Sequence, residues 1–115
     1  MASTASLERW AEHEWRDGMA IADLQPLDQL LVHTQNSTYE IVIVSPDEAE
    51  VAVRGGAYFP TFARVRVAGS SLGGSFLKLH AIHVGFRIEF ALESRSVVTS
   101  LVRTIAITRS RDTPM

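Results

Sequence analysis

Two histidines in the second half of the chain are the first residues whose spacing could support chemistry. His80 and His83 are three residues apart, which is a spacing found in some metal sites. On a strand, residues three apart point to opposite faces, so a shared site needs a turn, which Gly85 nearby permits. The chain has no cysteine to complete a ligand set. We therefore expect two surface or loop histidines, with no metal and no cofactor.

The stretch at residues 69–75, Gly-Ser-Ser-Leu-Gly-Gly-Ser, could hold an anion through backbone N–H groups. A phosphate loop requires Lys and then Ser or Thr after its last glycine, at the start of a helix. Here the last glycine precedes Ser-Phe-Leu-Lys in a strand-like context. The pattern favours a bulged turn in which glycine supplies a positive φ. A small-molecule or anion site remains an alternative, and it would use this stretch, with Ser70, Ser71 and Ser75, together with Lys78, His80 and His83.

Basic residues on neighbouring predicted strands form the third candidate. Arg64, Arg66, Lys78 and Arg87 are expected to point outward, near the aromatic residues Tyr58, Phe59, Phe62 and Phe76. A basic sheet face with exposed aromatic rings is how small barrels bind single-stranded nucleic acid. The isoelectric point near 6.0 argues against this function, because nucleic-acid-binding domains are usually strongly basic. We retain it as an alternative.

The charge is unevenly distributed along the chain. Residues 1–57 carry three bases and ten acids, whereas residues 58–115 carry eight bases and three acids, for a total net charge of −2. Such a division indicates either a basic binding face or attraction between the two halves within one fold. We favour the second interpretation.

The usual catalytic patterns are missing from the sequence. There is no cysteine nucleophile and no G-x-S-x-G motif around a serine. The acid pairs Glu48 with Glu50 and Glu89 with Glu93 are expected to be solvated surface carboxylates. The sequence therefore favours a protein that is not an enzyme, without excluding one.

The first segment has the pattern of an amphipathic helix. Leu7, Trp10, Ala11, Trp15 and Met19 fall on one side when the chain is wound at about 100° per residue. Pro26 would end any extension of this helix. We expect the two tryptophans to dock the helix onto the rest of the fold, and an interface with a partner is the alternative.

After Pro26 the apolar residues alternate with a period of two, which predicts strands. The segment at residues 38–45 is apolar on both faces, as expected for a central strand. The predicted fold is mainly β, an antiparallel small barrel or sandwich of about seven short strands with one N-terminal amphipathic helix. We predict a single domain, with a helix and connection at 1–26, a β domain at 27–108 and a frayed tail at 109–115. The predicted strands cover residues 29–34, 38–45, 50–54, 62–68, 75–80, 85–92, 96–99 and 102–108.

Several short motifs between Leu27 and Ile107 together resemble a group of known sequences. The motifs are Asn36-Ser37-Thr38-Tyr39, Val53-Arg54-Gly55-Gly56 with Phe59-Pro60, the stretch at 69–75, and Thr99-Ser100-Leu101-Val102-Arg103-Thr104-Ile105. On these residues the chain resembles small bacterial all-β domain proteins that carry no assigned activity. The resemblance implies a fold of short strands and supplies no catalytic residue.

These observations lead to one expected function. The N-terminus lacks the pattern of a secretory signal, and the longest apolar runs are about five residues against the roughly 20 of a membrane helix. We expect a soluble cytoplasmic protein that acts as a non-enzymatic binding or interaction module whose ligand the sequence does not identify, with a protein partner and self-association both left open. The expected ligand-binding residues are Arg64, Arg66, Lys78, Arg87, Ser70, Ser71 and Ser75.

Overall fold

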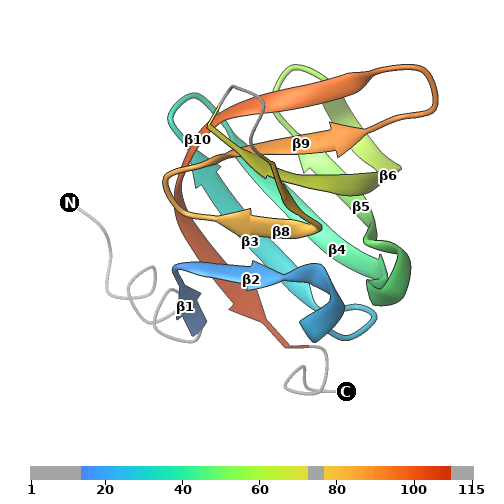
Figure 1. Cartoon of the computed structure of the whole chain (residues 1–115), viewed down its shortest axis with the longest axis vertical. Helices are drawn as coiled ribbons and strands as arrows, with labels where there is room; N and C mark the ends of the chain where they lie inside the picture. The colour runs from blue at the N-terminus through green and yellow to red at the C-terminus, as the bar shows by residue number, and fades with distance from the viewer. Residues whose placement is uncertain (1–13, 73–76, 110–115) are drawn as a thin grey trace.

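The computed structural model describes residues 14–72 and 77–109 of the 115-residue chain (Figure 1). The fold is mainly β, and every strand pair is antiparallel. Within the described residues, no helix has the length and apolar character needed to cross a membrane. The mainly β class predicted from the sequence is confirmed.

The strands vary from three to thirteen residues in length. Two single-turn 3-10 helices, η1 (Ile21–Asp23) and η2 (Pro46–Glu48), interrupt them. The strands are β1 (Glu14–Arg16), β2 (Gly18–Ala20), β3 (Gln29–Thr34), β4 (Thr38–Ser45), β5 (Glu50–Gly55), β6 (Phe59–Ser71), β7 (Leu77–Leu79), β8 (Ala81–His83), β9 (Arg87–Ala91) and β10 (Ser96–Thr108).

Pairing connects six of the strands in a closed path. Strands β3, β4, β5 and β6 pair in chain order, β6 then pairs with β9, β9 with β10, and β10 with β3. The two thirteen-residue strands make this possible, because β6 and β10 each pair with different neighbours along their lengths. Strands β1 and β7 extend the sheet from β10 and β6, while β2 and β8 form a separate two-stranded sheet in front of β3 and β10 (Figure 1).

The core lies on the inner face of this path, where the period-two alternation places the apolar side chains. Ile41, Ile43, Val51 and Val53 on β4 and β5 have no exposed surface. Phe90 of β9 is also fully buried, and its ring meets Phe59 edge-on at 5.6 Å between ring centres. In β5 the period-two alternation therefore identified the inner face correctly, whereas β4 is apolar on both faces and fully buries only one of them.

The predicted N-terminal helix is wrong over the described residues. Residues before Glu14 lie outside the described chain, but residues 14–16 and 18–20 are strands and residues 21–23 form η1. Residue Trp15 pairs with Ala106 of β10, and Met19 pairs with Ile82 of β8. These long-range pairings override the local helical pattern.

Three other predictions of strand boundaries differ from the structure. The strand predicted at 62–68 extends over Phe59–Ser71, so Gly69 to Ser71 lie in a strand and not in a loop. The strands predicted at 96–99 and 102–108 are one strand, β10, whose pairing shifts in register between Val98 and Leu101 and between Val102 and Thr104. The strand predicted at 75–80 is shorter in the structure, where it is β7 (Leu77–Leu79), and β8 follows β7 after a turn.

Candidate functional site

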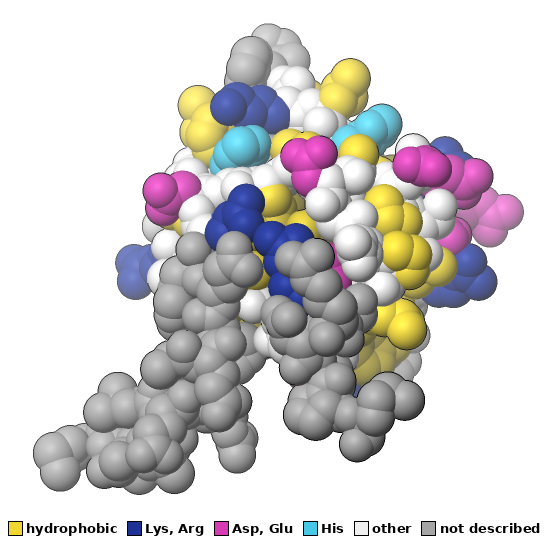
Figure 2. Space-filling view, turned by 90° about the horizontal axis from the view of Figure 1, so that it is seen from below, with side chains coloured by type: hydrophobic (Ala, Val, Ile, Leu, Met, Phe, Trp, Pro, Cys, Tyr) yellow, Lys and Arg dark blue, Asp and Glu magenta, His cyan; other side chains and the backbone are white. Residues whose placement is uncertain are grey.

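The predicted basic residues of β6 point outward but are matched by acids. Arg64 Nη2 lies 2.7 Å from Glu50 Oε1, and Arg66 Nη2 lies 3.7 Å from Glu48 Oε2. Acidic and basic side chains also lie side by side at one edge of the face seen in Figure 2. Both pairs join the acidic first half of the chain to the basic second half, as the charge distribution led us to favour.

Lys78 of β7 and Arg87 of β9 lie on the two strands that pair with the end of β6, and their side chains point to opposite faces of the sheet. The register pairs Lys78 with Ser70 and Arg87 with Ser71. Paired residues share a face, whereas consecutive residues of a strand do not. The Lys78 ammonium lies 5.5 Å from the centre of the Phe86 ring, and Arg87 Nη1 donates to the carbonyl oxygen of Thr99 at 3.2 Å. The four predicted bases therefore do not form one continuous surface.

The predicted serines differ from one another. Ser70 is fully buried, and its Oγ donates to the carbonyl oxygen of Ala81 at 2.7 Å. Ser71 is also fully buried, but its Oγ has no hydrogen-bond partner among the described residues. Ser75 lies outside the described residues.

The sequence predicted a bulged turn between two strands at residues 69–75, but Gly69 lies within β6, where the strand pairing is irregular. The register of β6 against β9 shifts between Val67 and Gly69, and Gly69 has a φ of 155°. A Cβ on Gly69 would lie 2.2 Å from the carbonyl oxygen of Lys78. Glycine is therefore required here by the close approach of β7 to β6.

The two histidines occupy different environments. His80 lies in the turn between β7 and β8 with a φ of 52°, and His83 lies in β8 opposite Gly18. Burial lowers the pKa of His83, and the positive charge of Lys78 lowers it further. Across residues 14–72 and 77–109, no group of three or more His, Asp and Glu side chains could hold a metal ion.

The aromatic residues expected beside the bases are divided between core and surface. Phe59 is buried against Phe90, whereas Tyr58 and Phe62 are exposed. Phe76 lies outside the described residues. In the described part of the chain, the arginines over exposed rings are Arg54 on Phe62 and Arg95 on Tyr58, and neither belongs to the predicted set.

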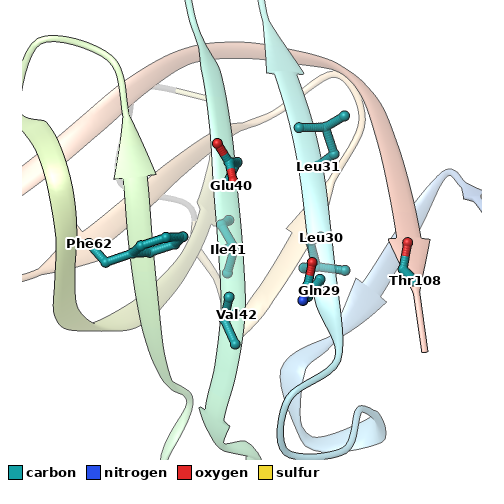
Figure 3. A pocket seen from close by; sticks show the side chains of 8 residues that line it. All are labelled: Gln29, Leu30, Leu31, Glu40, Ile41, Val42, Phe62 and Thr108. Carbon is teal, nitrogen blue, oxygen red and sulfur yellow. The ribbon is translucent and has the colours of Figure 1, made fainter. Parts of the chain in front are cut away.

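A groove that the sequence analysis missed lies on the outer face of the sheet (Figure 3). It has a volume of about 420 Å³. Phe62 reaches from β6 toward β4, and Thr108 of β10 closes the opposite side. Its apolar outward-facing side chains are Leu31, Val42 and Phe62. The full lining consists of Gln29, Leu30, Leu31, Glu40, Ile41, Val42, Phe62 and Thr108.

A fixed ion pair borders this groove. Arg54 Nη2 donates to both carboxylate oxygens of Glu40, at 2.8 and 2.9 Å. The guanidinium carbon of Arg54 also lies 4.5 Å from the centre of the Phe62 ring. One arginine thus holds both the acid and the aromatic ring, although the Phe62 side chain remains 45% exposed.

The sequence did contain a signal for the groove. Residues 38–45 are apolar on both faces, and we interpreted this as a strand buried on both sides. In the structure Ile41 and Ile43 fill the core, while Val42 and Val44 face outward and are half-buried. Apolar residues on the outer face of an antiparallel strand indicate a surface that can bind.

The geometry defines a mainly β, antiparallel protein with a groove of mixed apolar and polar lining on its outer face. Comparison with known protein families, curated proteins and solved structures finds no match to this chain. The resemblance to small bacterial all-β proteins therefore stays a prediction, and the function has to be argued from the site.

Proposed function

We propose that the protein is a non-enzymatic binding module and that the outer groove is its binding surface. The observation that carries this proposal is the groove of about 420 Å³, in which Leu31, Val42 and Phe62 lie beside the Glu40–Arg54 ion pair. Ligand pockets in proteins typically measure about 300–1,000 Å³ and combine apolar walls with a few fixed polar groups.

The strand pairing supports a rigid scaffold for this surface. A path of pairs that returns from β10 to β3 supports the small barrel, one of the two architectures predicted from the sequence. In such a scaffold the alternation of side chains fills the interior and leaves the outer face for binding.

The chemistry of the groove favours binding over catalysis. Among the described residues that line it, the carboxylate is Glu40, and Arg54 occupies both of its oxygens. A general base requires a carboxylate free to accept a proton from a bound substrate. Gln29 and Thr108 can orient a ligand through hydrogen bonds.

Anilinonaphthalene sulfonate, a fluorescent anion whose aromatic rings bind exposed apolar surface, tests the proposal on the full chain at a protein concentration low enough for the chain to be monomeric. We expect Phe62→Ser to weaken binding of the probe at least about tenfold, because it removes one wall of the groove. Val98→Ser is the matched control, since Val98 is 48% exposed but does not line the groove. Equal effects of the two variants, or no effect of Phe62→Ser, would contradict the proposal.

A second candidate, an oxyanion site, rests on Ser71 and Arg87. The Ser71 hydroxyl is buried without a partner, and Arg87 opposite it has no carboxylate within ion-pair distance among the described residues. An oxyanion would match both groups. Inorganic phosphate should then raise the melting temperature of the wild type but not of Arg87→Gln. No rise in the wild type would reject this candidate.

Single-stranded nucleic-acid binding on the predicted basic face stays a prediction. The ion pairs of Arg64 and Arg66 count against it, because phosphate groups would have to displace Glu50 and Glu48. A short oligonucleotide included in the same melting experiment tests it. Stabilisation that disappears as salt increases would favour the basic face.

A further inference from the structure

We infer that the occupant of the groove is a second copy of this chain, so that two grooves face each other in a two-fold homodimer. This inference rests on the proposed function, because it identifies the partner of the same surface. In a two-fold interface one patch must be complementary to itself. The shape and the charge of the groove both meet this condition.

The shape argument starts from Phe62. Its ring is 45% exposed at the edge of the groove, so it is both a wall of one copy and a projection toward another. An apolar cavity of about 150 Å³ accepts a benzene molecule. A groove of about 420 Å³ therefore has room for a phenyl ring from a partner. Partly exposed aromatic side chains are typical anchors at the centre of protein interfaces.

The charge argument starts from the ion pairs of the outer face. Arg54 pairs with Glu40, and the neighbouring strands add the pairs of Arg64 with Glu50 and Arg66 with Glu48. Each pair is neutral, so two copies of this face approach each other without net repulsion between these groups. A two-fold axis beside Glu40 and Arg54 places each guanidinium near the partner's carboxylate.

The position of the other exposed apolar residues supports this choice of face. The other large exposed hydrophobic residues that the structure describes, Leu27, Tyr58, Leu72, Leu79 and Val98, do not line the groove. Single exposed apolar residues are normal on a protein surface. The outer faces of β3 and β4, with Phe62 of β6, instead combine apolar area with a concave shape.

Sedimentation velocity over a range of concentrations tests the inference with the full chain. We expect a species of twice 12.7 kDa whose proportion increases with protein concentration. Phe62→Ser should raise the dimer dissociation constant at least about tenfold, and Val98→Ser should leave it unchanged. Arg54→Glu should also weaken the dimer, whereas Arg54→Glu combined with Glu40→Arg should restore it.

The possible results separate this inference from the proposed function. A wild type that is monomeric at every concentration overturns the dimer. A dimer that survives Phe62→Ser also overturns it, because the contact would then lie on another face. If the monomeric protein still binds the fluorescent probe and Phe62→Ser abolishes that binding, the binding module stands and only the choice of partner fails. Circular dichroism confirms folding, and Leu31→Thr provides a second variant of the same face.

Discussion

Ser70 and Ser71 are neighbours on β6 whose hydroxyl groups have opposite environments, although both side chains are fully buried. The Ser70 hydroxyl donates to the carbonyl oxygen of Ala81, whereas the Ser71 hydroxyl has no partner in the described part of the chain. We therefore expect alanine at the two positions to shift the free energy of unfolding in opposite directions.

The magnitudes follow from the cost of burying polar groups. A buried hydroxyl without a hydrogen bond costs about 1–3 kcal/mol, so Ser71→Ala should raise the free energy of unfolding by about 1–2 kcal/mol after a small loss of packing. Ser70→Ala removes a buried hydrogen bond and should lower the free energy of unfolding by about 1–3 kcal/mol. For a chain of 115 residues, 1 kcal/mol corresponds to roughly 4 °C in melting temperature.

Urea denaturation followed by circular dichroism measures both variants against the wild type. The midpoints should move in opposite directions with an unchanged slope, because neither substitution alters the surface exposed on unfolding. A Ser71→Ala variant that is less stable than the wild type, or equally stable, would refute the reasoning, since the hydroxyl would then have a partner. In that case the second candidate function would lose its main support as well.

Four further substitutions test other features of the fold by urea or thermal unfolding. Gly69→Ala should lower the free energy of unfolding by more than about 2 kcal/mol, because its Cβ would meet the Lys78 carbonyl oxygen. Gly85 has a φ of 87°, and a Cβ there would lie in open space, so Gly85→Ala should lower the free energy of unfolding by only about 1 kcal/mol. If Gly69→Ala and Gly85→Ala lower the free energy of unfolding equally, the steric argument is contradicted. Leu27 is exposed and has a φ of 72°, a backbone conformation that asparagine tolerates better than leucine. Leu27→Asn should therefore raise the free energy of unfolding by about 0.5–1 kcal/mol, and a decrease would contradict this prediction. Burial, and then Lys78, lower the pKa of His83, so the unfolded chain binds more protons between the folded pKa and about 6.5. The stabilising contribution of neutral His83 is therefore complete above about pH 6.5 and decreases as the pH falls through that window, and His83→Gln should show a smaller drop in melting temperature between about pH 7.5 and about pH 5.5.

The central strands could be predicted because their signals are local. Strands β3 and β4 begin and end where the alternation and the flanking turn residues placed them. The N-terminal strands could not be predicted in this way. Ala11, Trp15 and Met19 are spaced by four residues, and that spacing places side chains on one face of a helix and also on one face of a strand. Only the pairing with Ala106 and Ile82, far along the chain, decides between the two.

For the predicted site residues, too, the local features could be predicted from the sequence and the long-range contacts could not. Alternation correctly placed Arg64 and Arg66 on the outer face, because it depends on neighbouring residues alone. Their acidic partners depend on the register between β5 and β6, which the sequence does not specify. The separation of Lys78 from Arg87 likewise depends on how β7 and β9 pair with opposite sides of β6.

The ion pairs of the outer face influence binding more than folding. Both members of the Arg54–Glu40 pair are about half exposed, and exposed pairs contribute about 0–1 kcal/mol to stability. Their effect on partner choice is larger, because each pair removes a free positive charge that an anionic ligand would require. The acids near Arg64 and Arg66 thus convert an apparently basic sheet face into a neutral one. A neutral face beside an exposed aromatic ring selects an apolar, uncharged contact, which is the kind of surface that a second copy of the chain presents.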